Sequence, residues 1–298
     1  MAGLDAIETT FVNQYSTNVL YLASQEMSKL RGTVINDSVQ GEEKFWDQYG
    51  TVDVLERTTR FGDSPINVTP RESRRLALYA YESGEPIDSF DRVKTLNDPA
   101  SPIVRRHAQA FARQYDKTIV DALLGTAQVG RKTLTPTALP AGQTVAVNDH
   151  NFDSGTGNVG LTVGKLIAAR NILGNNDVES DTYHIAVTQT QLSNLLAEDK
   201  ATSSDYAAIK ALVNGEINSF MGFTFHRIST SILPVDSNSY RRVVAYTPDA
   251  GVLGIGEDVQ AFIDRRADKS FNWYAYMSMF IGATRVEESK VVEILCTE

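Results

Sequence analysis

Apolar residues recur every three or four positions in several stretches of the chain, and this spacing predicts amphipathic helices. One such stretch covers residues 11–27 and ends near Gly32. A longer one begins at Ser101, a favourable N-cap that is followed by Pro102, and stops at Gly125. About two dozen residues at ~1.5 Å each predict a rod roughly 36 Å long. Its apolar stripe consists of Val104, Ala108, Phe111, Tyr115, Ile119 and Ala122.

Alternation of apolar and polar residues predicts a long hairpin after the first helix. Residues 54–84 read as two strands around a long tip, which Gly62, Pro65 and Pro70 interrupt. Residues 35–50, by contrast, read as an irregular connector. The arms of this hairpin contain few residues that could form a core of their own. They therefore indicate either a surface hairpin with a solvated charged face or an arm whose apolar side needs a partner.

The second half of the chain contains both the three-to-four-residue spacing of helices and the alternation of strands, which predicts the α+β class. Helices are predicted over residues 161–174, from Thr188 onward and over 203–215, and strands over 182–187 and 219–228. The last part, from residue 241, reads as successive strands, with a turn at the glycines of 251–256.

Composition excludes several classes of protein. The chain has 298 residues and a net charge of −9, so bulk charge gives it no grip on nucleic acid. Cys296 is the single cysteine, which excludes an intrachain disulfide and fits a reducing compartment. The N-terminus does not read as a signal peptide, and the longest uncharged stretch, 270–284, is too short and polar for a membrane span. We interpret the chain as a soluble protein that is intracellular where it is made.

Candidate chemical motifs are weak. The glycines of "GTGNVG", residues 155–160, match a dinucleotide-binding pattern, but the candidate strand ends at Val147, too early to place them at a pyrophosphate. The run "GLTVGKL", residues 160–166, has the wrong spacing for a phosphate loop. His184 and His226 fall in predicted strands, where ordinary sheet positions are the simpler interpretation. The sequence therefore indicates no catalytic site, no metal site and no cofactor.

The order of the elements resembles the major capsid protein of tailed bacteriophages, which has the Hong Kong ninety-seven-like capsid fold. Five segments carry this resemblance in the same order over nearly the whole chain. They are residues 11–34, 60–99, 161–178, 202–225 and 267–294. The resemblance implies a structural protein, not an enzyme, that self-assembles as hexamers and pentamers into the icosahedral head enclosing viral double-stranded DNA.

The resemblance also implies five parts along the chain. These are the N-terminal arm (1–53), the extended loop (54–99), a peripheral domain with the long spine helix (100–160), the axial domain (161–261), and peripheral-domain strands with the C-terminus (262–298). In such shells the extended loop lies over a neighbouring subunit. Its arginines are therefore expected to form bidentate hydrogen bonds with acidic residues of neighbours. The expected contact residues are Arg57, Arg60, Arg71, Arg74 and Arg75.

The resemblance further implies a set of partners. They are copies of the chain itself, a portal, a decoration or cement protein, and a scaffolding protein. The scaffolding protein is expected to be separate, because the arm begins within the first dozen residues. Double-stranded DNA is expected to be enclosed without sequence-specific binding, and no membrane is expected to take part. The expected location is the virion, after assembly in the cytoplasm of the host bacterium.

Some capsids of this fold join subunits covalently, through a lysine on the extended loop and an asparagine of a neighbour. Between Phe45 and Val93 this chain has no lysine, and Lys94 lies at the predicted base of the loop. Arginine guanidinium groups stay protonated and do not attack amides. Non-covalent shells are therefore expected.

Two alternatives stay open at this point. One is an enzyme that uses the glycine loop, which a nucleotide-binding assay would detect. The other is a subunit of an encapsulating nanocompartment of the same fold, which the genes next to it would distinguish from a phage capsid protein.

Overall fold

The computed structural model describes the chain with several gaps. It covers residues 27–58, 60, 64, 66–87, 100–149, 157–176, 178, 180, 182–196 and 218–298, with side chains in the long helix described from Arg105 onward. Apart from Met27, the helices predicted over 11–27 and 203–215 lie outside these residues. The chain divides into two units, each described by itself. The larger contains residues 28–79, 114–256 and 281–298, and the smaller contains 1–27, 80–113 and 257–280.

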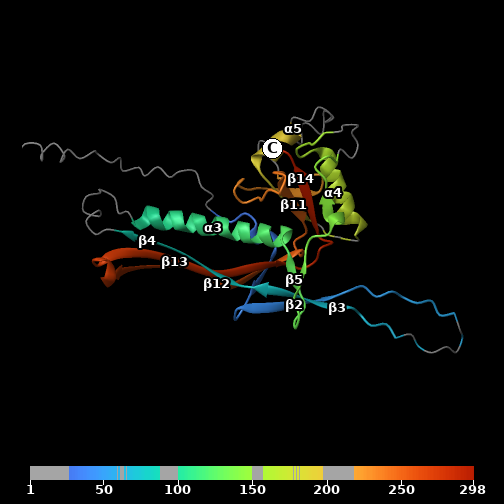
Figure 1. Ribbon diagram of the computed structural model, residues 1–298, viewed down its shortest axis with the longest axis horizontal. Coiled ribbons are helices and arrows are strands. Elements are labelled where there is room, and N and C mark those ends of the chain that lie inside the picture. The colour runs from blue at the N-terminus through green and yellow to red at the C-terminus, as the bar shows by residue number, and fades with distance from the viewer. Residues whose placement is uncertain are drawn as a thin grey trace, which may run out of the picture. The chain divides into compact units, whose positions relative to one another are not determined.

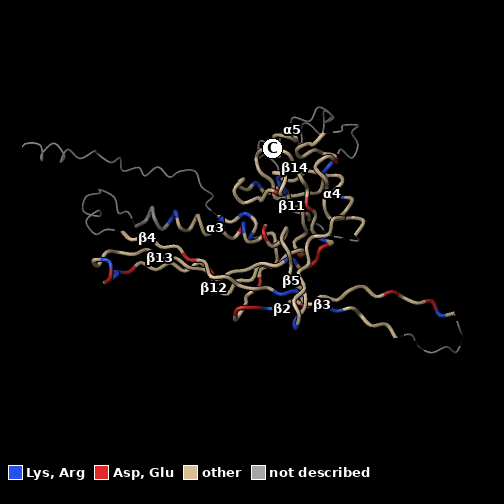
Figure 2. Tube along the Cα trace, in the orientation of Figure 1, with Lys and Arg blue, Asp and Glu red and all other residues tan. Residues whose placement is uncertain are grey.

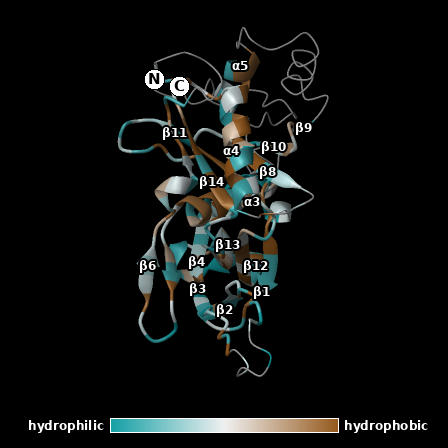
Figure 3. Cartoon of the chain, turned by 90° about the vertical axis from the view of Figure 1, so that its right-hand side faces the viewer, coloured by the Kyte–Doolittle hydropathy of each residue, from teal (hydrophilic) through white to brown (hydrophobic). Residues whose placement is uncertain are grey.

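A six-stranded sheet forms the core of the larger unit (Figure 1). Its strands, in spatial order, are β7 (Thr144–Val145), β14 (Val291–Cys296), β11 (Arg241–Tyr246), β8 (Tyr183–Val187), β10 (Phe223–Arg227) and β9 (Ser219–Phe220). Figure 3 shows hydrophobic residues concentrated in β11 and β14, and the central strands are almost fully buried. The parallel pair of β7 and β14 lies in the same sheet as β8, β10 and β11.

Helices α4 (Val163–Asn175) and α5 (Gln189–Leu196) confirm two sequence predictions. The side chain of Thr162 accepts a hydrogen bond from the backbone N–H of Lys165, which caps the start of α4. At the start of α5, the side-chain oxygen of Gln191 accepts the backbone N–H of Thr188 at 2.9 Å, one half of a capping box. Local sequence therefore sets where both helices begin.

The segment predicted as one strand over 219–228 is instead a tight hairpin of β9 and β10. Met221 and Gly222 connect the two strands with φ angles of 52° and 82°. Positive φ at both central residues is the geometry of a two-residue turn that matches the natural twist of the strands. The chain reverses there because glycine accepts this conformation without strain.

The predicted connector over 35–50 is wrong, because it contains two strands. β1 (Ile35–Ser38) pairs in parallel with the first part of β12 (Gly251–Arg266), and β2 (Glu43–Tyr49) pairs antiparallel with β3 (Arg71–Ala77). The sheet that contains β2 and β3 continues through β5 (Ala127–Val129) to β6 (Thr135–Thr137). The alternation in β2 is faint because all seven of its side chains are exposed or half-buried in the subunit. A strand with little buried surface carries little hydrophobic pattern.

The predicted turn at 251–256 is also wrong, because these residues begin β12. Packing leaves little room for a side chain at Gly254. A Cβ atom at this position would lie 2.5 Å from the Leu76 side chain and 3.1 Å from those of Leu78 and Val39. The glycine therefore lets the strand approach this apolar layer closely.

β12 and β13 (Asn272–Arg285) form a long hairpin, and β4 (Tyr79–Ile87) lies beside β13 in the sheet order β1-β12-β13-β4. In the smaller unit, Ala275, Met277 and Met279 of β13 are buried. On the alternate positions, Tyr276 donates a hydrogen bond to Glu82 at 3.0 Å. This alternation is that of a sheet with one covered face.

The long helix α3 runs from Ala100 to Leu124, one residue earlier than the predicted cap. Gly125 ends it, with its N–H bonded to the carbonyl of Asp121 at 2.8 Å. Phe111, Tyr115 and Ile119 are buried, as predicted, and Ala122 is half-buried. The predicted apolar stripe is wrong at one position: Ala108 is exposed in the subunit, while its neighbour Gln109 is buried. No helix among the described residues is long and apolar enough to span a membrane.

Candidate subunit-contact surface

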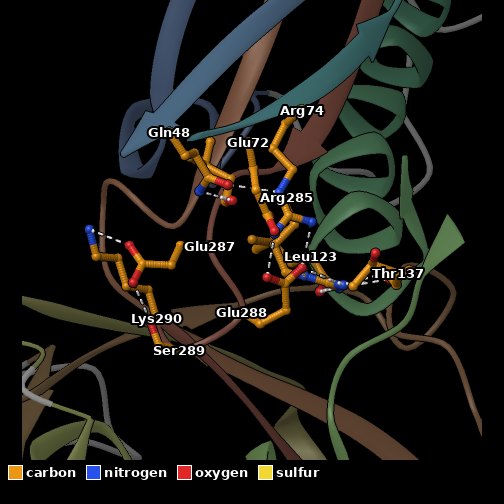
Figure 4. A network of polar contacts seen from close by, with 12 residues as sticks. Gln48, Glu72, Arg74, Leu123, Thr137, Arg285, Glu287, Glu288, Ser289 and Lys290 are labelled. Carbon is orange, nitrogen blue, oxygen red and sulfur yellow. Dashed lines mark hydrogen bonds and ion pairs between the residues drawn. The ribbon is translucent and has the colours of Figure 1, made fainter. Parts of the chain in front are cut away.

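An ionic cluster holds the base of the β2–β3 hairpin within the larger unit (Figure 4). Arg74 of β3 donates two hydrogen bonds to the carboxylate of Glu288, at 2.8 and 2.6 Å, and a third to the side chain of Gln48 at 2.9 Å. Its side chain is only 5% exposed. Bidentate pairs between arginine and carboxylate are the strong, orienting form of this interaction. The cluster thus ties β2 and β3 to the 286–290 segment.

Arg285 extends this cluster to the end of α3. Its guanidinium donates to the carbonyl oxygens of Leu123, Gly125 and Thr137 at 2.8, 2.7 and 3.0 Å, and lies 3.4 Å from Glu288. The side chain is completely buried, and burial lowers the pKa of its guanidinium. The carbonyls that follow the last turn of a helix carry partial negative charge, which a buried cation offsets. We name Arg74, Arg285 and Glu288 the base cluster.

A groove of about 520 Å³ opens beside the base cluster. Its lining residues are Gln48, Tyr49, Gly50, Thr51, Pro70, Glu72, Arg74, Val286 and Glu287. Arg74 is buried at its inner side, whereas the side chains of Glu72 and Glu287 at its mouth are 60% and 43% exposed. The exposed charges of the groove lining are therefore acidic.

Residues 50–70, which we name the extended segment, leave β2 and β3 as two arms (Figure 1). The N–H of Gly50 bonds to the carbonyl of Pro70 at 2.9 Å, and the side chain of Asn67 bonds to the carbonyl of Asp53 at 2.8 Å. The arms therefore run beside each other. Several large apolar side chains on them are exposed in the subunit: Val52, Val54, Leu55, Ile66 and Val68. Such a concentration of exposed apolar residues marks a surface that binds another molecule.

The five arginines predicted as contacts have different environments. Arg74 is engaged in the base cluster, inside its own subunit. Arg75 forms an ion pair with Glu43 across the β2–β3 pair. Arg71 is exposed and lies over the ring of Tyr49, with 5.2 Å between guanidinium and ring centre. Arg57 and Arg60 are exposed on the extended segment, where the guanidinium of Arg57 donates to the carbonyl of Arg60. Figure 2 shows the charged positions along this part of the chain.

The sequence did not indicate the base cluster, because its members are far apart along the chain. Arg74 and Glu288 are separated by 214 positions. The one local signal is a charged residue, Arg285, at the end of the otherwise uncharged strand β13. A fully buried arginine requires carbonyl or carboxylate partners, so that signal predicts a polar cluster without identifying its members.

The described residues around the glycine motifs do not have the arrangement that a nucleotide site needs. β7 ends at Val145 and α4 begins at Val163, so neither adjoins the glycines of 155–160 as such a site requires. Lys165 is buried and donates to the carbonyl oxygens of Val147, Val159 and Leu295 at 3.0, 2.8 and 2.7 Å. Because these carbonyls use all three of its donors, the ammonium cannot serve a bound phosphate.

The histidines predicted to occupy sheet positions do so. His184 on β8 and His226 on β10 lie next to each other, with 3.0 Å between Nδ1 of His184 and Nε2 of His226. Burial, with a contribution from His184, lowers the pKa of His226 to about 4. Within the described parts of the chain, no three His, Cys, Asp or Glu side chains are grouped to hold a metal ion.

Comparison with known proteins identifies the family. A model of the phage capsid protein family matches residues 7–298. The chain belongs to this family. A search of curated proteins finds no match.

Solved capsid structures share the fold of this phage capsid protein at low sequence identity. The capsid protein of cyanophage P-SCSP1u is 13% identical, with a TM-score of 0.69, and the match covers 98% of this chain and 94% of that one. A protein of Mycobacterium phage Che8 is 16% identical, with a TM-score of 0.69 and coverages of 95% and 97%. The capsid of a native GTA particle is 11% identical, with a TM-score of 0.67 and coverages of 99% and 98%.

The family and the fold together give the role of the chain. It is a structural major capsid protein with the Hong Kong ninety-seven-like fold, and it is not an enzyme. As a component of a virion shell, it associates with copies of itself. The surfaces that make these contacts are therefore its functional sites.

Proposed function

We propose that this phage capsid protein assembles as hexamers and pentamers into a closed icosahedral head that encloses double-stranded DNA. The observation that carries the proposal is the extended segment. It projects exposed apolar side chains that its own described residues do not bury. Exposed apolar surface is costly in water, and a neighbouring subunit in a ring can cover it. No observation favours the nanocompartment alternative.

The extended segment lies over the neighbouring subunit in this proposal, and the base cluster determines its direction. A long two-stranded arm is only marginally stable by itself. The bidentate pair of Arg74 and Glu288 fixes the start of one arm to the body of the larger unit. Of the predicted contact arginines, Arg57, Arg60 and Arg71 are exposed in the subunit, and we expect them to contact acidic groups of neighbours. Arg74 serves to orient the segment.

The remaining partners follow from the same role. A closed head requires a portal for DNA entry, and a separate scaffolding protein and a decoration or cement protein complete the proposed set. The chain has a net charge of −9, so DNA is enclosed without tight or sequence-specific binding. Assembly takes place in the cytoplasm of the host bacterium.

Shortening the extended segment tests the proposal. The pairing of Gly50 with Pro70 and of Asp53 with Asn67 places Thr51 opposite Thr69. Residues 52–68, which include all the exposed apolar side chains of the segment, can therefore be replaced by Asn-Gly, which closes a two-residue hairpin. This variant is expected to fold with unchanged thermal unfolding and to form no shells in electron micrographs of expressing cells. The matched control is Val235→Ser, which alters an exposed apolar residue elsewhere and should leave shells intact. Normal shells from the shortened variant would refute the proposal.

A further inference from the structure

The groove beside the base cluster opens on one face of the β2-β3-β5-β6 sheet. In the β2–β3 pair, Gln48 lies opposite Glu72, and Arg74 follows Glu72 two positions later. Because successive side chains of a strand point to opposite faces, these three residues share one face. All three line the groove, and its volume of about 520 Å³ is in the ~300–1,000 Å³ range of binding sites. The groove can therefore receive side chains of another molecule.

The mouth of the groove carries an excess of negative charge. Four carboxylates and three cations form the ion pairs of this region. They are Glu72, Glu287, Glu288 and Asp249, against Arg74, Arg285 and Lys290. The two guanidinium groups are buried at the inner side, whereas Glu72 and Glu287 at the mouth are 60% and 43% exposed. A cation that enters the mouth therefore balances the charge.

The β5–β6 hairpin carries the opposite charge. Residues 122–148 contain Arg131 and Lys132 and no acidic residue, in a chain with a net charge of −9. The turn between β5 and β6 begins at Gly130, whose φ angle is 103°, and residues 131–134 are exposed. We name residues 130–134 the basic tip. Figure 3 shows β6, the edge strand of the sheet to which the basic tip leads.

Arg131 fixes the basic tip against the face of the sheet opposite the groove. Its guanidinium donates two hydrogen bonds to Asp47, at 2.7 and 2.6 Å, and a third to Ser73 at 3.2 Å. Asp47 and Ser73 are partners across β2 and β3, and they alternate with the residues that line the groove. Arg131 is thus occupied within its own subunit. Lys132 is exposed, and no ion pair holds it within the described part of the chain.

We propose that the basic tip of one copy enters the groove of a second copy, where Lys132 pairs with Glu72 and Glu287. This inference rests on the proposed function and names a contact between copies that does not use the exposed apolar side chains of the extended segment. Because the tip and the groove lie on opposite faces of one sheet, the contact is head-to-tail and can close into a ring.

Charge and shape both favour a second copy as the occupant. Copies with a net charge of −9 repel one another on average, and a cation placed between two carboxylates offsets part of that repulsion. Pro70 and Val286 add apolar groups to the groove lining, which suit the aliphatic stem of a lysine side chain. Arg131 holds the tip in one position before contact, which lowers the entropy cost of binding.

Charge exchange tests this pairing. Lys132→Glu and Glu72→Lys each place like charges at the contact, so each alone should raise the subunit concentration needed for assembly about tenfold, measured by light scattering. The double variant exchanges the two charges and should restore assembly. Lys117, an exposed lysine on α3, provides the matched control. Lys117→Glu makes the same change in net charge as Lys132→Glu but should not rescue Glu72→Lys.

Thermal unfolding of the unassembled variants should match that of the unaltered subunit, because all three side chains are exposed. Normal assembly of both single variants, no rescue in the double variant, or equal rescue by Lys117→Glu would overturn the proposal. If the shortened variant fails to assemble while charge exchange has no effect, the proposed function stands and this contact is wrong.

A second measurement does not depend on charge reversal. A carbodiimide couples a lysine amine to a carboxylate when the two are in contact, and mass spectrometry of the digested particles identifies the joined residues. Assembled particles should yield Lys132 joined to Glu72 or Glu287, and unassembled subunits should not. Lys132→Arg keeps the charge, so it should assemble and lose this crosslink. Absence of the crosslink from particles, or its presence in unassembled subunits, would show that the groove does not receive the tip of a second copy.

Discussion

Replacing Glu288 with alanine is expected to destabilise the subunit severely. Glu288 lies between two buried guanidinium groups, with oxygens 2.8 and 2.6 Å from Arg74 and 3.4 Å from Arg285. Without it, Arg285 keeps its three backbone carbonyls and Arg74 keeps only Gln48 and a distant Glu72, 3.7 Å away. Most of the cost therefore comes from Arg74, left as a buried charge without a carboxylate in close contact.

The magnitude follows from what it costs to break a buried ion pair. Removing one partner typically costs about 3–5 kcal/mol, because the remaining charge stays away from water. The neighbouring Glu287 provides the matched control. Its side chain is 43% exposed and lies 3.0 Å from Lys290. Exposed pairs contribute about 0–1 kcal/mol, so Glu287→Ala should change stability by no more than that.

Urea unfolding of the unassembled subunit, followed by circular dichroism, measures both variants. Glu288→Ala should lower the midpoint strongly without changing the slope, and Glu287→Ala should leave both nearly unchanged. The double variant Arg74→Met with Glu288→Leu removes both charges and should be less destabilised than Glu288→Ala alone. If Glu288→Ala matches Glu287→Ala, or if the double variant is the least stable of the three, the reasoning about the buried charge is wrong.

The remaining predictions concern the core, pH, crosslinking and the glycine loop. Phe111→Ala should lower the free energy of unfolding by about 3–5 kcal/mol, because the ring is buried. Thermal unfolding like that of Ala108→Ser, a substitution at an exposed position, would refute this prediction. Because the folded pKa of His226, about 4, is below its unfolded value near 6.5, stability is full above about pH 6.5 and falls as pH drops towards 4. His226→Gln should weaken this dependence of stability on pH. An unchanged dependence in the variant would contradict the prediction. Boiled particles should run as one band near 32.8 kDa, since no lysine lies between Phe45 and Val93, and a ladder would contradict this. Gly157→Ala should leave assembly unchanged, because no atom of the described residues lies within 4 Å of its added Cβ. Micromolar nucleotide binding that this variant abolishes would overturn the interpretation.

Elements with a strong local signal could be predicted from the sequence alone. The long helix is one, since its apolar spacing and Gly125 are written in consecutive residues, and α4, α5 and β8 are others. The absence of a catalytic motif, and the order of elements that identified the capsid family, also needed no structure. Helices and strands of this kind depend on hydrogen bonds and side-chain periods within a few residues, so the sequence displays them directly.

Tertiary structure decided the features whose partners are distant. It showed that Gly254 serves packing and not a turn, because the three side chains above it come from other segments. It showed that Arg74 has a different environment from the other arginines of its region, because only Arg74 faces Glu288, 214 positions away. It also gave the register between the two arms of the extended segment. Long-range pairing depends on which side chains complement each other in space, and a local pattern does not contain that information.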